Sequence, residues 1–156
     1  MKKEFSFKYE HFISVTDLDD AQQNLMKEAN KAMNNAYAPY SKFKVGAALL
    51  LDDGSYIHGS NQENIAYPSG LCAERVALFS LGAQFPDKKV KKIAIVGQGS
   101  LISSDDLLTP CGSCRQVMSE VASNQGKDFE ILMKNHDGSV LVFDGIDKLL
   151  PFTFGS

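Results

Sequence analysis

Residues 110–116 of the chain are Pro-Cys-Gly-Ser-Cys-Arg-Gln, and residues 72–75 are Cys-Ala-Glu-Arg. These two segments contain all three cysteines of the 156-residue chain. Cys111 and Cys114 lie three positions apart at the expected start of a helix, so both sulfur atoms can face one point. Cys72 lies at the expected start of the preceding helix. Because a helix N-terminus favours a thiolate over a thiol, the two helices can converge on one metal ion.

Three thiolates and one carboxylate that is not a ligand predict a zinc site whose fourth position is open to water. Glu74 is the candidate acid/base. Residues i and i+2 of a regular helix do not face each other, so Cys72 and Glu74 can share a site only if Cys72 lies at or before the helix cap.

Two other interpretations of the cysteines are less favoured. A redox Cys-x-x-Cys pair would leave Cys72 and Glu74 unexplained, and a structural zinc usually has four protein ligands. The three histidines have no ligand spacing; they are His11, His58 and His136.

A zinc ion with three thiolates carries a net negative charge, which would make its water a poorer acid. Arg75 and Arg115, next to the two cysteine segments, are the candidates to donate N–H bonds to the sulfur atoms. We favour Arg75 for this role and expect Arg115 to be a solvated charge on the helix surface.

The composition limits the class of protein. The net charge is −3, and the chain has no basic stripe of the kind that nucleic-acid binders show. It has no apolar stretch of about 18 residues that could cross a membrane and no apolar run typical of a signal peptide. Three cysteines cannot form a closed set of disulfides. We therefore expect one domain over residues 1–156, located in the cytoplasm, with no nucleic-acid or membrane partner.

Hydrophobic periodicity predicts alternating strands and helices. Strands are expected at 3–13, 45–51, 55–60, 92–97, 129–134 and 139–143. Helices are expected from Thr16 or Asp17 to about Ala36, from Cys72 to Gln84, from near Cys111, and at 146–149. This order implies a mixed sheet with helices on its faces.

Four motifs occur in a recognisable order: Tyr-Ala-Pro-Tyr-Ser-Lys-Phe-Lys-Val-Gly-Ala-Ala-Leu at 37–49, Asn-Gln-Glu-Asn at 61–64, and the two cysteine segments. A three-cysteine zinc, a Glu acid/base and a Pro-Cys-x-x-Cys segment form the signature of nucleobase deaminases. From about Ala36 to its C-terminus the chain resembles the small cytidine deaminases of the homotetrameric, three-cysteine type. The resemblance implies a three-layer α/β/α fold with a five-stranded mixed sheet, to which the N-terminal strand of this chain would be an addition.

The resemblance also implies roles for single residues. Cys72, Cys111 and Cys114 would bind one zinc ion per subunit, and Glu74 would shuttle protons. The predicted substrate contacts are Asn61 and Glu63 to the ribose hydroxyls, Phe43 to the pyrimidine or sugar, and the Ala73 backbone to the base. Phe43 could equally be a core residue at the start of its strand.

The C-terminal segment Leu149-Leu150-Pro151-Phe152-Thr153-Phe154 carries an aromatic residue that, in the family, reaches the active site of a neighbouring subunit. Phe154 matches that residue better than Phe152, although a tail packed on its own subunit is the competing interpretation. Ile65 and the long 98–109 loop depart from the family pattern.

The implied reaction is zinc-dependent hydrolysis of cytidine and deoxycytidine to uridine and deoxyuridine with release of ammonia, as in pyrimidine salvage. A deaminase of an aminopyrimidine nucleoside antibiotic such as blasticidin S is a rival, against which the Asn-x-Glu-Asn segment argues. A non-enzymatic zinc module is another rival; Glu74 argues against it, and four protein ligands would favour it. Editing of RNA or DNA is disfavoured by the acidic charge and by the absence of an aromatic, basic surface.

Overall fold

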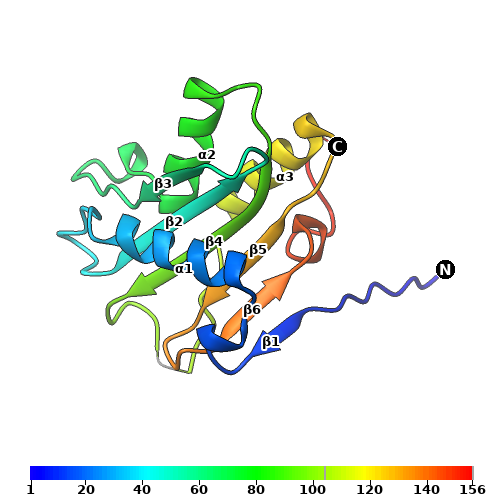
Figure 1. The fold of residues 1–156 in the computed structure, drawn as a ribbon, viewed down its shortest axis with the longest axis horizontal. Helices are drawn as coiled ribbons and strands as arrows, with labels where there is room; N and C mark the ends of the chain where they lie inside the picture. The colour runs from blue at the N-terminus through cyan, green and yellow to red at the C-terminus, as the bar shows by residue number, and fades with distance from the viewer. Residues whose placement is uncertain (104, 156) are drawn as a thin grey trace.

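A computed structural model describes residues 1–103 and 105–155 and contains one six-stranded sheet with the order β1-β6-β5-β4-β2-β3 (Figure 1). The strands are β1 (Glu10–Phe12), β2 (Lys44–Leu51), β3 (Tyr56–Ser60), β4 (Val90–Gln98), β5 (Glu130–Lys134) and β6 (Val140–Phe143). The pair β4–β5 is parallel and the other pairs are antiparallel. The predicted mixed sheet of five strands with an added N-terminal strand is confirmed.

Helices cover both faces of this sheet, as predicted. Helix α1 (Asp20–Met33) lies on one face, where Leu25 and Ala29 pack in one cluster with Ala48 of β2. Helices α2 (Ala73–Gln84) and α3 (Gly112–Gln125) lie on the other face (Figure 1). Side chains of a strand alternate between faces, so Ala47 and Leu49 belong to the second cluster. No helix in the described parts of the chain has the length and apolar character to cross a membrane.

Three short 3₁₀ turns complete the described elements: η1 (Val15–Asp17), η2 (Tyr67–Ser69) and η3 (Ile146–Lys148). The predicted last helix is therefore a 3₁₀ turn. The prediction that α1 begins at residue 16 or 17 is wrong, because Ser14 and Asp17 form a capping box that closes η1. A second capping box, between Asp19 and Gln22, starts α1 at Asp20.

The predicted strand over 3–13 is also too long, since β1 covers only Glu10–Phe12. Glu10 pairs with Val142, and β6 ends one residue later at Phe143. Within the described residues the segment before Tyr9 therefore has no neighbouring strand, although its sequence alternates as a strand does.

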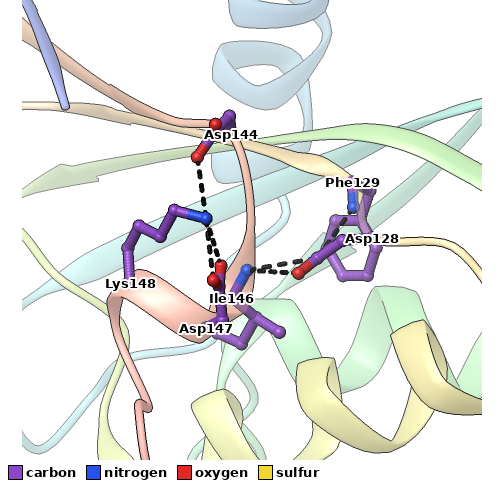
Figure 2. A network of polar contacts seen from close by, with 6 residues as sticks. All are labelled: Asp128, Phe129, Asp144, Ile146, Asp147 and Lys148. Carbon is purple, nitrogen blue, oxygen red and sulfur yellow. Dashed lines mark hydrogen bonds and ion pairs between the residues drawn. The ribbon is translucent and has the colours of Figure 1, made fainter. Parts of the chain in front are cut away.

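The connection from β6 to the C-terminus is fixed by the Asp128 carboxylate (Figure 2). It accepts hydrogen bonds from the backbone N–H of Ile146 at 3.1 and 3.0 Å and from the N–H of Phe129 at 2.8 Å. Lys148 forms ion pairs with Asp147 at 2.7 Å and with Asp144 at 3.2 Å on the same turn. This network sets where η3, and the C-terminal segment after it, leave the sheet.

Replacing Asp128 with alanine is expected to lower the free energy of unfolding by about 1–3 kcal/mol, because it leaves the N–H of the buried Ile146 without an acceptor. Urea unfolding of the two proteins measures the difference. The matched control is Asp144→Ala, whose side chain is 79% exposed and which is expected to change stability by less than about 0.5 kcal/mol. Equal effects of the two substitutions would contradict the anchoring role of Asp128.

Candidate functional site

The three cysteines meet between the N-termini of α2 and α3. Cys72 is the N-cap of α2, Cys111 is the N-cap of α3, and Cys114 lies in the first turn of α3. The Sγ atoms of Cys72 and Cys111 are 3.9 Å apart, those of Cys111 and Cys114 are 3.5 Å apart, and all three lie within 4.8 Å of one another.

This donor set fits a single tetrahedral zinc ion. With Zn–S bonds of about 2.3 Å, tetrahedral thiolates lie about 3.8 Å apart, close to the separations of the sulfur atoms. Within residues 1–103 and 105–155, no histidine or carboxylate completes the cluster as a fourth ligand. The arrangement is that of a zinc site with an open position and does not favour a closed structural site.

Glu74 lies beside the sulfur cluster and is almost fully buried, with 4% of its surface exposed. Cys72 has extended backbone angles (φ −69°, ψ 155°) and precedes the helix, which is the condition for Cys72 and Glu74 to reach one site. Burial raises the pKa of the Glu74 carboxyl to about 7, and the nearby negative charge of Cys72 adds to the shift. A carboxyl group with such a pKa can both accept and return a proton near neutral pH.

The pKa values of the Cys72 and Cys114 thiols are shifted in opposite directions. A hydrogen bond from the Cys114 thiol, with a smaller contribution from the Arg75 guanidinium, lowers the pKa of Cys72 to about 5 against the effect of burial. The hydrogen bond to Cys72 and burial raise the pKa of Cys114. The protein itself thus favours the thiolate form of Cys72 over that of Cys114.

Arg75 points toward the cysteines, and Arg115 does not. Nη2 of Arg75 lies 3.9 Å from Sγ of Cys72, while its buried Nε has no hydrogen-bond partner in the described part of the chain. Arg115 donates to the carbonyl oxygens of Pro110 and Leu149, both at 2.8 Å. The expectation that Arg115 is a solvated surface charge is wrong, because its guanidinium links the start of α3 to the C-terminal segment.

A cavity of about 470 Å³ opens beside Cys72 and Arg75. It contains Asn61 and Glu63, two of the predicted substrate residues. The other lining residues are Tyr40, Ser41, Gln62, Asn64, Tyr67, Gly70 and Leu71. Sequence reasoning gave no role to Tyr40 or Tyr67, whose rings meet edge to face at 6.1 Å on the cavity wall. Tyr40 lies within the quoted 37–49 motif, whereas the loop that holds Tyr67 has no periodicity that could have indicated it.

The polar cavity residues are held by the neighbouring backbone. Oδ1 of Asn61 accepts a hydrogen bond from the N–H of Val45 at 2.8 Å, and its Nδ2 donates to the carbonyl oxygen of Phe43 at 2.9 Å. The Glu63 carboxylate accepts from the N–H of Tyr40 at 2.9 Å, and also from the hydroxyl and N–H of Ser41. The bond from the Ser41 hydroxyl is the main reason why the pKa of Glu63 is lowered. These hydrogen bonds fix the orientation of the Asn61 and Glu63 side chains in the cavity.

Three other predicted substrate residues do not line this cavity. Phe43 is 6% exposed, and its ring lies in the core against Gly97, where an added Cβ would come within 2.9 Å of it. Ala73 is fully buried as the first residue of α2. Phe154 is 87% exposed on the C-terminal segment, with its carbonyl oxygen bonded to Nε2 of Gln116 at 3.2 Å.

The position of the α2 N-terminus depends on a close approach to β3 at Gly59. A Cβ added to Gly59 would lie 2.2 Å from the carbonyl oxygen of Ala73 and 2.6 Å from the backbone N of Ala77. No real contact is this short, so any side chain at Gly59 would displace the N-terminus of α2, which carries Cys72 and Glu74, from β3.

Gly59→Ala is therefore expected to destabilise the fold by about 1–3 kcal/mol and to lower zinc affinity, because α2 must move. Thermal unfolding and zinc content measure the two effects. Gly82→Ala is the matched control, since a Cβ added at this position of α2 meets nothing within 4 Å; it is expected to keep full zinc content. Full zinc content and stability in Gly59→Ala would show that this contact does not position the site.

The chain is similar to several known proteins. A family model described as "Cytidine and deoxycytidylate deaminase zinc-binding region" matches residues 19–125. A cytidine deaminase from Halalkalibacterium halodurans is 41% identical over 133 residues, covering 85% of this chain and 93% of that protein. One from Mycobacterium tuberculosis is 34% identical over 145 residues, covering 88% and 93%. The crystal structure of cytidine deaminase from Burkholderia pseudomallei is similar with a TM-score of 0.72 and 41% identity, over 84% of this chain and 97% of that one.

Proposed function

The chain belongs to the cytidine deaminase family, and from this membership we propose that it hydrolyses the 4-amino group of cytidine and deoxycytidine. The products are uridine or deoxyuridine and ammonia, and the reaction serves pyrimidine salvage in the cytoplasm. The observation that carries the proposal is the buried Glu74 beside three converging cysteines that lack a fourth protein ligand in the described chain.

Cys72, Cys111 and Cys114 hold one zinc ion per subunit in this proposal. Zinc bound there supplies a Lewis acid that lowers the pKa of a water molecule at the open position. The Arg75 guanidinium, 3.9 Å from Sγ of Cys72, offsets part of the negative charge that three thiolates bring together.

Glu74 moves the protons. Its carboxylate takes a proton from the attacking water and gives it to the ring nitrogen beside the reacting carbon. It then takes the proton of the hydroxyl group added to that carbon and gives it to the amino group, which leaves as ammonia when the C–N bond breaks. One carboxyl group can serve as base and then as acid because these steps are sequential. A pKa of about 7 supports this double role.

The cavity residues orient the nucleoside. Asn61 and Glu63 hydrogen-bond the ribose hydroxyls, and the N–H of Ala73, in the first turn of α2 where no helical acceptor exists, is free to bind the base. Phe43 supports the sugar or base from the core. Phe154 extends into the site of a neighbouring subunit of a homotetramer, a role that its 87% exposure supports.

A nucleoside fits this cavity better than a nucleotide. Arg75 is the one cationic side chain among the described residues that line the cavity, and its guanidinium is directed at Cys72. A 5′-phosphate would therefore find no free cationic side chain among the described residues that line the cavity.

We expect cytidine to be deaminated with a kcat/KM at least about 100-fold above that for CMP or dCMP, since an unpaired charge in a partly buried site costs several kcal/mol.

Glu63→Gln is expected to raise KM for cytidine about 10-fold through a weakened hydrogen bond to the ribose while kcat stays similar. Steady-state kinetics with the three compounds measure both effects. Equal kcat/KM for cytidine and dCMP would contradict the preference for a nucleoside.

The direct test of the proposed function is ultraviolet absorbance of cytidine with the purified, zinc-loaded protein. Loss of the cytidine band, with uridine and ammonia in a 1:1 ratio as products, is the expected result. An unchanged band with zinc bound would reject cytidine as the substrate and favour another aminopyrimidine nucleoside.

A further inference from the structure

The first residues of the chain form an extended arm that leaves the body of the molecule (Figure 1). β6 ends at Phe143, so the arm continues past the end of the strand that pairs with β1. In the described part of the chain, the backbone of residues 2–8 has no hydrogen-bond partner. The arm thus presents free N–H and C=O groups in the extended form that pairs with another strand.

The two sides of the arm differ in chemistry. Phe5, Phe7 and Tyr9 lie on one side, where Phe7 and Tyr9 contact the ring of Phe143 at centroid distances of 6.2 and 5.3 Å. These three aromatic side chains remain half exposed, at 50%, 47% and 54%. Charged and hydroxyl side chains alternate with them in the sequence: Lys2, Glu4, Ser6, Lys8 and Glu10.

We propose that this arm pairs antiparallel with the same arm of a second copy of the chain, with the two Ser6 residues facing each other across a two-fold axis. In this register Lys2 lies opposite Glu10 and Glu4 lies opposite Lys8, and the symmetry forms each pair twice. Opposite charges that face each other across two strands stabilise the pairing. The charge pattern of the arm is therefore complementary to itself.

The aromatic side of the arm fits the same register. With Ser6 on the axis, Phe5 of each copy lies opposite Phe7 of the other, and aromatic cross-strand pairs are among the stabilising ones. The two rows of rings would cover surface that a single copy leaves half exposed.

Other registers of the two arms bring less favourable pairs of side chains opposite each other. Moving the axis to Phe7 places Glu4 opposite Glu10, and moving it to Phe5 places lysine opposite lysine. A shift by a single residue between the strands puts aromatic rings on the side of the charges. Like charges directly opposite each other destabilise a strand pair, so the sequence selects the Ser6 register.

The arm precedes residues 19–125, the part that the family model matches. The proposal therefore does not rest on the proposed function, and its test does not require cytidine turnover.

Disulfide cross-linking of the full, zinc-loaded chain tests the register. Facing residues of an antiparallel pair have Cα atoms about 4.5–5.5 Å apart, within the range of a disulfide. Ser6→Cys is expected to form a linked dimer under mild oxidation. Lys8→Cys, whose two copies would lie about 13 Å apart along the strands, is expected to link at least about 10-fold more slowly. Glu4→Cys mixed with Lys8→Cys is expected to give the heterodimer. The unsubstituted chain measures the background from its own cysteines.

A charge exchange in the Ser6→Cys background tests the complementarity. Glu4→Lys is expected to slow cross-linking several-fold, and Glu4→Lys with Lys8→Glu is expected to restore the rate. Three results would overturn the proposal: no cross-link from Ser6→Cys, equal cross-linking from Lys8→Cys, or no effect of Glu4→Lys.

Discussion

Glu74→Gln is expected to keep the zinc ion and the fold while lowering kcat for cytidine by about 10⁴-fold. Glutamine has nearly the same shape as glutamate and fits the same buried position, which is only 4% exposed. It cannot take a proton from water or pass one to the ring nitrogen and the amino group. A loss of turnover without a loss of metal would separate the proton-transfer role from the ligand role.

The measurement combines the ultraviolet assay with zinc content determined by elemental analysis. Glu120→Gln makes the same substitution at an exposed position of α3 and is expected to leave both values unchanged. Activity of the Glu74→Gln protein within a few-fold of the unsubstituted chain would reject Glu74 as the acid/base.

Cys111→Ser is expected to lower zinc affinity by more than about 100-fold, because a hydroxyl is a far weaker zinc ligand than a thiolate. The deamination activity should disappear with the metal. The free energy of unfolding should also fall, by up to about 4 kcal/mol when free zinc exceeds the Kd of the unsubstituted chain about 1,000-fold. The reason is that zinc binds the folded chain, in which the three thiols converge, and not the unfolded chain.

Thermal unfolding with and without a chelator checks this expectation. The chelator should lower the Tm of the unsubstituted chain and leave the Tm of Cys111→Ser unchanged. Ser113→Ala, at an exposed position two residues after Cys111, is the control that should behave as the unsubstituted chain does. Full zinc occupancy in Cys111→Ser would remove Cys111 from the set of ligands.

The elements around the site were predictable because their signals are local. The two Pro/Gly-flanked cysteine segments indicate helix starts, and the structure places Cys72 and Cys111 at N-caps. The alternation of Ala47, Ala48 and Leu49 between two hydrophobic clusters likewise follows from strand periodicity.

The errors at the N-terminal strand and at Arg115 arose where the answer depends on a distant segment. Residues 3–9 alternate as a strand, but whether they pair is decided by the end of β6 at Phe143. Arg115 looks like a surface charge in sequence, but its bond to the carbonyl oxygen of Leu149 joins residues 34 positions apart. The cavity wall at Tyr67 depends on how an irregular loop folds back, which no periodicity describes.

The parallel pair β4–β5 has a consequence for the order of folding. Parallel strands require a crossover connection, and here that crossover contains α3 with Cys111 and Cys114. Cys72 lies 39 residues before Cys111, on the far side of β4. A metal ion can engage all three thiols only after the crossover has closed and α2 has docked beside it. Zinc thus captures a nearly complete fold, and its concentration should affect the rate of unfolding more than the rate of folding.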